Sequence, residues 1–358
     1  MKKMYLFVSM MVVAVMLLTA CGTAATPTAA PVVMPTATQA PVVPVLLPTN
    51  PPPTEVVPTP NPLGTSAMPI VLAFAPSTSQ TQLTTGGQAF ADALGKATGL
   101  SFKVSVPTSY AAQIEAMGSG NAQVGFLAPA AFIVAHAKSY ADVAMVSLRN
   151  GADHYAFQYI TNVARVNNGT FKVYYDPKAG KDTADAATAI AQFTGKKACW
   201  TDPISASGYL VPSGFLAANK IKISTGAWVQ GHPTVVKSIY LSPNGEICDF
   251  GATFVPMANI SDAKTGAFAD YATKVVTVWV SDPIIPNDTV AFGKTLPADM
   301  RQKISDAIVA MAGTPDGLKV LNGFGYSWSG VKVVDDTFFD DFRVYLQSIK
   351  FDFNNFNG

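Results

Sequence analysis

The chain has 358 residues, and its 24 Lys and Arg nearly balance 23 Asp and Glu, for a formal net charge of +1. Charged residues make up 13% of the sequence without a basic cluster, which argues against a nucleic-acid-binding protein. Its three histidines and three cysteines show no metal-ligand spacing, so we predict neither a metal nor another cofactor.

The first twenty residues have the composition of a secretory signal. Lys2 and Lys3 precede an uncharged, mostly apolar stretch over residues 4–18, and a Leu-Thr-Ala-Cys run ends at Cys21. This end resembles a bacterial lipobox. The resemblance implies a signal peptide over residues 1–20 and a lipid on Cys21, hence an extracytoplasmic, membrane-anchored protein. An ordinary secretory signal with an incidental cysteine is the alternative.

A Pro/Thr-rich segment follows over residues 21–66. It contains twelve prolines and a single charged residue, Glu55. Proline removes backbone donors and favours extended structure, so we predict a semi-rigid tether rather than a folded unit. The remaining body of about 290 residues is long enough for two lobes, each with its own core.

The first part of the body alternates short apolar runs with amphipathic stretches, which predicts an α/β lobe. The expected strands cover residues 68–75, 102–107, 123–127 and 143–148. The expected helices cover residues 88–98, 110–117 and 130–138.

The middle of the chain repeats the alternation. An Asn-Asn-Gly turn at residues 167–169 separates β-rich runs at 155–166 and 170–175, so we predict a hairpin there. Further strands are expected at residues 197–200, 227–229 and 249–254. Further helices are expected at residues 183–193 and 209–218 and from about His232.

The last third is mainly helical. A β-branched strand is expected at residues 274–280, followed by helices at 298–311, 314–322 and 336–347. We expect these helices to pack back on the first α/β block.

We therefore predict a discontinuous first lobe, residues 67–158 and 278–358, and an inserted second lobe, residues 159–277. The hinge would lie where the chain crosses, near residues 157–161 and 276–281, with a cleft between the lobes.

The loop over residues 201–212 places small hydroxyl residues between a strand and an apolar helix. The free N–H groups and positive dipole of a first helical turn favour an oxyanion, and Ser205 and Ser207 would add hydroxyl donors. Either serine can instead be a simple N-cap. The loop alone leaves both readings open.

Cys199 and Cys248 remain as a pair when Cys21 carries lipid. In an oxidising compartment they can form a disulfide if their strands are neighbours, or they can both be small buried residues. Both readings stay open.

Six short motifs occur in an order that resembles the phosphate/phosphite/phosphonate substrate-binding protein family of ABC transporters. The resemblance covers about residues 68–345. The motifs are YAAQIEAM at 110–117, GFLAPAAF at 125–132, TDPISASGYLVP at 201–212, GHPTVV at 231–236, DFGAT at 249–253 and IPND at 285–288. The family has a two-lobed type II periplasmic-binding fold, which is the α/β architecture expected here.

The resemblance also implies roles for single residues. The implied contacts to a phosphorus oxyanion are Tyr110, Ser205, Ser207, Gly208 and His232. Ser77 and Thr78 would supply further donors from the first lobe, and Asp249 would lie near the variable end of the ligand or accept a P–OH proton. His136 and His154 match no motif and are expected to be structural.

Three positions depart from the family pattern. Ala206 replaces a threonine in the serine loop, Phe132 stands where a tyrosine is common, and Phe126 stands at a tryptophan position. Losing one hydrogen bond to a charged group weakens binding by about 1.5–3 kcal/mol unless another donor replaces it. The identity of the oxyanion therefore stays open.

The resemblance implies a receptor that binds a phosphonate, phosphite or phosphate and delivers it to an ABC permease and its ATPase. One alternative is the same fold with a sulfonate or a thiamine precursor as ligand. Another is a lipoprotein that reports its ligand to a membrane kinase. We expect no enzyme, since the sequence lacks Gly-x-Ser-x-Gly and nucleotide phosphate-loop motifs.

Overall fold

The computed structural model describes residues 63–255 and 268–352, which fall in one compact unit, 59–358. The expected signal peptide, Cys21 and most of the tether lie outside the described residues. No helix within the described ranges is both long enough and apolar enough to span a membrane.

The body begins a few residues before the predicted boundary. Leu63 packs against the apolar core, and Gly64 N donates to Met68 O at 2.8 Å. Ser101 N donates in turn to Gly64 O at 2.7 Å. Residues 63–66, which were assigned to the tether, therefore belong to the folded unit.

The first lobe is built on a six-stranded sheet with the order β15-β4-β14-β3-β1-β2. Its strands are β1 (Ile70–Phe74), β2 (Phe102–Ser105), β3 (Val124–Leu127), β4 (Ala141–Leu148), β14 (Thr289–Gly293) and β15 (Gly330–Val333). β1 runs parallel to β2 and β3, whereas β14 runs antiparallel to β3 and β4. β1 and β3 are almost entirely buried, as strands covered on both faces should be.

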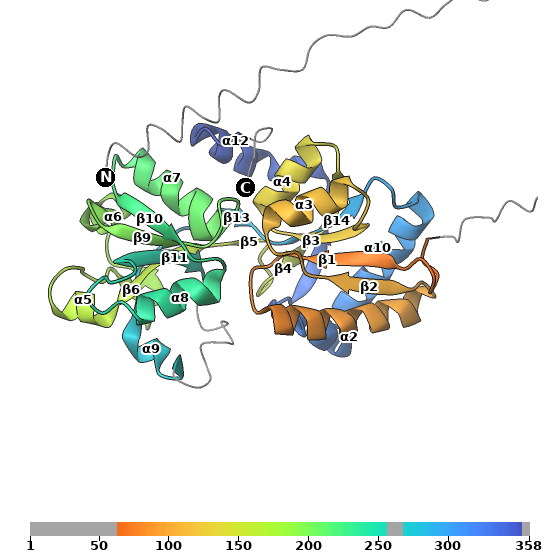
Figure 1. The fold of residues 1–358 in the computed structure, drawn as a ribbon, viewed down its shortest axis with the longest axis horizontal. Helices are drawn as coiled ribbons and strands as arrows, with labels where there is room; N and C mark the ends of the chain where they lie inside the picture. Colours follow the sequence, from red (N-terminus) through yellow and green to blue (C-terminus); the bar gives the residue numbers. More distant parts are fainter. Residues whose placement is uncertain (1–62, 256–267, 353–358) are drawn as a thin grey trace, which may run out of the picture. The chain divides into compact units, whose positions relative to one another are not determined.

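Helices cover both faces of this sheet. They are α2 (Gln80–Thr98), α3 (Tyr110–Gly118), α4 (Pro129–Ala137), α10 (Ala298–Ala312) and α11 (Pro315–Asn322). Side chains of α2, α10 and α11 share one apolar core, and those of α3 and α4 belong to another. Figure 1 shows α3 and α4 on one side of β1 and α2 on the other.

Phe126 belongs to the first of these cores. Its ring stacks on Phe74 at a centroid distance of 4.5 Å and meets Phe90 and Phe324 edge-on. The replacement of the family's tryptophan by Phe126 therefore affects the packing of this core.

The second lobe is built on a five-stranded sheet with the order β10-β9-β11-β6-β12. Its strands are β6 (Phe157–Asn162), β9 (Lys197–Trp200), β10 (Ser224–Trp228), β11 (Phe250–Phe254) and β12 (Val275–Val280). Its helical segments are α5 (Val163–Asn167), α6 (Ala186–Ile190), η1 (Ala191–Phe193), η2 (Ala206–Leu210), α7 (Val211–Ala218), α8 (His232–Tyr240) and α9 (Tyr271–Lys274). β6 runs antiparallel to both of its neighbours.

The hairpin predicted around residues 167–169 is wrong. Asn162 ends β6 and caps α5, because its side-chain oxygen accepts from Ala164 N at 2.9 Å. The Asn-Asn-Gly sequence then closes this short helix, with Gly169 at φ +77°. A small hairpin lies further on, between β7 (Tyr175–Asp176) and β8 (Lys181–Asp182).

The lobe boundaries also differ from the prediction. Phe157 and Gln158 pair with β11, and Val280 pairs with Gln158, so residues 157–158 and 278–280 belong to the second sheet. The chain crosses between the sheets over residues 149–156 and 281–288. There β5 (His154–Tyr155) and β13 (Ile285–Pro286) form a two-stranded antiparallel pair.

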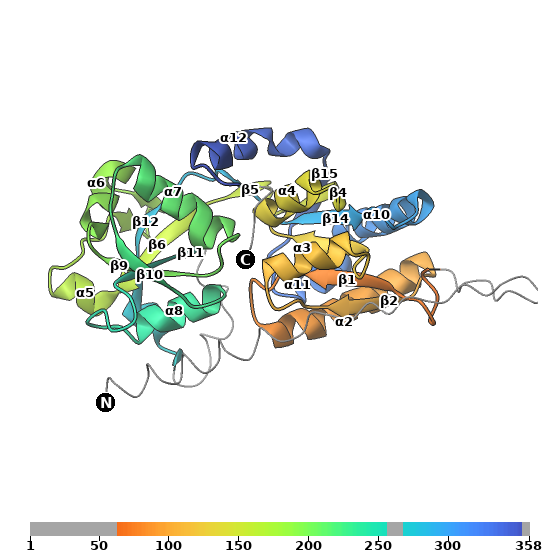
Figure 2. The same cartoon turned by 45° about the horizontal axis from the view of Figure 1, so that its top comes forward.

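The C-terminal segment contacts both lobes, whereas the prediction placed it on the first lobe alone. In η6 (Asp336–Phe339), the Phe339 ring lies 4.7 Å from that of Phe132 in α4. In α12 (Asp340–Ser348), Tyr345 Oη donates to Val211 O at the start of α7, at 2.9 Å. Figures 1 and 2 both show α12 beside α7.

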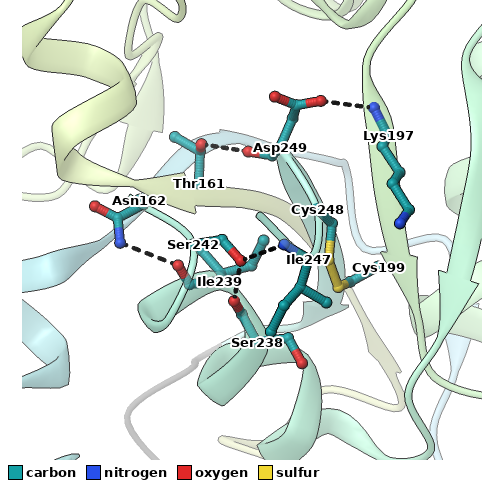
Figure 3. The surroundings of a disulfide bond; sticks show 10 residues. All are labelled: Thr161, Asn162, Lys197, Cys199, Ser238, Ile239, Ser242, Ile247, Cys248 and Asp249. Carbon is teal, nitrogen blue, oxygen red and sulfur yellow. Dashed lines mark hydrogen bonds between the residues drawn. A yellow bond between two sulfur atoms is a disulfide. The ribbon is translucent and has the colours of Figure 1, made fainter. Parts of the chain in front are cut away.

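Cys199 and Cys248 form a disulfide in the second lobe (Figure 3). Cys199 lies in β9, and Cys248 lies two residues before β11, its parallel neighbour. The two Cα atoms are 5.6 Å apart, within the usual range for a bridged pair. Because β9 and β11 are neighbours in the sheet, the two cysteines form a disulfide rather than two separate buried thiols.

Candidate functional site

A cleft of about 500 Å³ contains predicted site residues from both lobes. The first lobe contributes Ser77, Thr78 and Tyr110 to its lining. The second lobe contributes Ser205, Ala206, Ser207 and His232.

The serine turn, residues 201–207, follows β9 and includes the first two residues of η2. Ser205 Oγ accepts from Gly208 N at 3.1 Å, so this serine is an N-cap and also lines the cleft. Gly208, which the resemblance implies as a contact, does not line the cleft. A Cβ at this position would be 2.0 Å from Thr201 Oγ1, so only glycine lets the turn pack this tightly.

Ser207 is almost completely buried, and its Oγ lies 3.5 Å from Tyr155 Oη. It stands in the first turn of η2, which continues directly into α7. First-turn N–H groups have no partner within their own helix and carry the positive end of its dipole. The serine turn can therefore present backbone and hydroxyl donors to an oxyanion.

His232 opens α8 and is 3% exposed. Its Nδ1 lies 2.7 Å from Thr253 Oγ1. Burial, and then the positive charge of Arg149, lower the pKa of His232 to about 3. The ring is therefore neutral at ordinary pH and offers one N–H donor and one acceptor.

Tyr110 opens α3 and is 4% exposed. Burial, followed by the carboxylates of Asp202 and Asp288, raises its pKa well above the ordinary value. The phenol keeps its proton and can donate. Nearby, Ser77 Oγ and Tyr326 Oη lie 3.2 Å apart.

Asp249 is not brought to the cleft. Its carboxylate forms an ion pair with Arg165 and accepts from Lys197 N at 2.9 Å, a bond visible in Figure 3. These partners hold it at the start of β11, beside β9. The role near the ligand that the resemblance implies for Asp249 therefore has no support from its position outside the cleft lining.

Phe132 is also absent from the lining. It is fully buried and packs against Phe339. Its ring therefore lies in the core and does not line the cleft. Tyr155 and Tyr326 supply phenol groups there instead.

Several lining residues were missed by sequence reasoning. Arg149, Tyr155 and Tyr326 lie in no quoted motif, whereas Asp288 ends the IPND motif and was given no role. His154, which was expected to be structural, also lines the cleft, with Nδ1 2.7 Å from Asp153 Oδ1.

Within the described residues, no group of three or more His, Cys, Asp or Glu side chains is placed to hold a metal ion. The chemistry of the cleft is that of hydrogen-bond donors, aromatic rings and one ion pair.

Two sequence comparisons agree on the family. The profile of a family described as "ABC transporter, phosphonate, periplasmic substrate-binding protein" matches residues 72–338. The phosphate-import protein PhnD of Mycolicibacterium smegmatis is 27% identical over 227 residues. That match covers 60% of this chain and 63% of the relative, so the chain spans less than two thirds of the relative's length.

Solved structures share the fold at low sequence identity. A binding protein component of an ABC phosphonate transporter from Pseudomonas aeruginosa has a TM-score of 0.63 at 18% identity, covering 78% of this chain and 86% of that one. PhnD1 from Prochlorococcus marinus in complex with methylphosphonate has a TM-score of 0.65 at 10% identity, covering 79% and 98%.

Proposed function

Because the chain belongs to the periplasmic substrate-binding protein family of ABC phosphonate transporters, we propose that it binds a phosphonate, phosphite or phosphate between its lobes. It then delivers this oxyanion to an ABC permease and its partner ATPase. The family and the type II periplasmic-binding fold predicted from the sequence are confirmed. The ligand, its delivery and the partners are the proposal.

The observation that carries the proposal is the set of donors facing one cleft. The first lobe contributes Tyr110, which is protonated. The second lobe contributes the serine turn and His232, which is neutral. A tetrahedral oxyanion accepts several hydrogen bonds from different directions, and bonds to a charged acceptor are the stronger ones. The relatives support the same ligand class, since one is a phosphate-import protein and another is bound to methylphosphonate.

Binding would also favour one arrangement of the lobes. An anion that contacts Tyr110 and Ser207 together joins the two lobes, so it stabilises a closed state relative to an open one. The crossing segments, residues 149–156 and 281–288, are where the backbone would adjust.

Titration calorimetry on the full chain tests this function. The panel is phosphate, phosphite and methylphosphonate, with sulfate and methanesulfonate as rival oxyanions. The Ser207→Ala/His232→Ala double variant should lose roughly 100-fold or more in affinity, since two bonds to a charged group are removed. Ser213→Ala is the matched control, because Ser213 does not line the cleft and its Oγ donates to Leu210 O in the preceding turn. Equal affinities of all three proteins would rule out this site.

The membrane anchor is a separate part of the proposal. We infer from the lipobox-like run that Cys21 carries lipid and that residues 22–62 connect it to the body. The expected result is that Cys21→Ala moves the protein out of the membrane fraction. Mass spectrometry of the N-terminal peptide should then show the lipid in wild type alone. An unmodified Cys21 in the wild-type protein would contradict this.

A further inference from the structure

An ion pair between Arg149 and Asp288 lies at the first-lobe side of the cleft. Arg149 directly follows β4 and Asp288 directly precedes β14, its antiparallel neighbour. Ser147 N donates to Asp288 O at 2.9 Å, so the sheet itself keeps the two segments together. The side chains are 18% and 13% exposed, which leaves the pair mostly buried at the cleft wall.

Two aromatic rings hold the guanidinium group in place. Arg149 Cζ lies 5.4 Å from the centroid of the Tyr155 ring and 5.9 Å from that of Tyr326. A cation near aromatic faces is stabilised electrostatically, and the Asp288 carboxylate fixes one end of the planar fork. Little side-chain freedom remains to be lost when a ligand binds.

Arg149 also has donor capacity left over. Its Nε is buried and has no hydrogen-bond partner among the described residues. A buried cationic N–H without an acceptor is unfavourable, so a small shift of the guanidinium toward an acceptor in the cleft would relieve it.

The positive charge of Arg149 acts electrostatically on residues of the opposite, second-lobe wall of the cleft. It contributes to the lowered pKa of His232. In addition, the Tyr155 ring that it faces carries the hydroxyl 3.5 Å from Ser207 Oγ. An anion seated at the serine turn would therefore lie in the field of the guanidinium.

The same pair supplies the formal charges of the cleft lining. Among the described residues that line the cleft, Arg149 is the only Lys or Arg and Asp288 the only Asp or Glu. The Asp288 carboxylate is already bonded to Arg149, and Asp249 is bonded to Arg165 outside the cleft. In the described part of the cleft lining, a ligand ammonium group would therefore meet a positive charge and no carboxylate free of a cationic partner.

We propose that Arg149, positioned by Asp288, donates to the bound phosphorus oxyanion from the first lobe. The cleft thereby selects phosphate and phosphonates with uncharged substituents over phosphonates that carry an ammonium group. This inference rests on the proposed function, because it requires a phosphorus oxyanion in the cleft.

The test is calorimetry of the full chain with inorganic phosphate, methylphosphonate and aminoethylphosphonate. Arg165→Gln is a matched control for Arg149→Gln. Arg165 also pairs with an aspartate, faces the Phe171 ring at 5.9 Å and has a buried Nε without a partner, yet it does not line the cleft.

Wild type and Arg165→Gln should prefer methylphosphonate to aminoethylphosphonate by about tenfold or more. Arg149→Gln should lose roughly 10- to 100-fold in phosphate affinity and most of that preference. Arg149→Lys keeps the charge but lacks the forked donors. It should keep the preference while binding phosphate roughly tenfold more weakly.

The outcomes separate the two proposals. If wild type binds no phosphorus oxyanion, the proposed function fails and this inference fails with it. If wild type binds but Arg149→Gln behaves as Arg165→Gln does, only the role of Arg149 is overturned. If Arg149→Gln does not fold, Arg149→Lys decides, because wild-type affinity in that variant would exclude the forked contact.

Discussion

His232 Nδ1 lies 2.7 Å from Thr253 Oγ1, which joins the start of α8 to β11. Both residues are buried, and Thr253 is completely so. The hydroxyl fixes the orientation of the imidazole ring and occupies one of its two nitrogens. The ring is therefore held in position before any ligand arrives. When the Thr253 hydroxyl donates to Nδ1, the ring proton is on Nε2, which can then donate to a ligand at a lowered entropic cost.

The lowered pKa of His232 predicts a pH-dependent contribution to stability. The unfolded chain takes up a proton near pH 6.5, whereas the folded protein resists protonation until about pH 3. Below about pH 6.5 the free energy of unfolding should thus fall by up to about 1.4 kcal/mol per pH unit from this residue, and above it the contribution is constant.

His232→Asn removes this contribution. The free energy of unfolding of wild type minus that of the variant, measured by urea titration between about pH 7 and about pH 4, should decrease steadily as the pH falls. The subtraction cancels acidic groups such as Asp288, whose pKa burial raises. A difference that is independent of pH would show that His232 is not buried in a neutral form.

Gly208→Ala should disrupt the serine turn. The added methyl group would lie 2.0 Å from Thr201 Oγ1 and 2.8 Å from Ser205 Oγ, so both must move. Overpacking of this kind costs typically about 1–3 kcal/mol, and movement of Ser205 should also weaken phosphate binding.

Gly313→Ala is the control, since its added methyl group has only ordinary contacts from 3.5 Å outward and φ is −81°. Thermal unfolding and calorimetry should separate the two variants. Equal melting temperatures and equal affinities would mean that the turn is not packed as tightly as the structure has it.

A feature of the fold or the site can be predicted from the sequence when the residues that determine it lie close together in the chain. The serine turn and the starts of α3 and α8 follow from short motifs, so Ser205, Ser207, Tyr110 and His232 could be named in advance and the structure brings them to one cleft. The misassigned hairpin has a local cause as well, since the Asn162 cap starts a helix where a strand was expected to continue.

Residues that were missed come together through topology instead. Arg149 and Asp288 are 139 positions apart and meet only because β4 and β14 are neighbours in the sheet. Tyr326 reaches the cleft from the segment that follows α11. No sequence pattern within one segment predicts a contact between distant segments. The hydrogen bond from Tyr345 to Val211 was missed for the same reason.

Removing the disulfide should lower stability without changing affinity. The bridge joins residues 49 positions apart, and such a closed loop stabilises the folded state by about 2–4 kcal/mol. Neither cysteine lines the cleft. The Cys199→Ala/Cys248→Ala variant should therefore unfold at a lower temperature and bind phosphate as wild type does. A reductant should lower the melting temperature of wild type and leave that of the variant unchanged.

Asp249→Asn should lower the free energy of unfolding and leave phosphate affinity unchanged, whereas Ser207→Ala should lower phosphate affinity and leave stability nearly unchanged. Asp249 lies outside the cleft, where its carboxylate pairs with Arg165, whose side chain is 13% exposed. Replacing the carboxylate by an amide leaves this guanidinium mostly buried beside a neutral group, at a cost of about 1–3 kcal/mol in the free energy of unfolding. Phosphate affinity should not change.

Ser207→Ala provides the contrasting result, because it removes a donor from the cleft and no observed core contact except the 3.5 Å approach of Tyr155 Oη. It should weaken phosphate binding while changing the free energy of unfolding little. Urea titration and calorimetry on both variants therefore distinguish a structural aspartate from a ligand contact. If Asp249→Asn weakened binding as Ser207→Ala does, the ligand would have to reach the start of β11, and the cleft described here would not be its whole site.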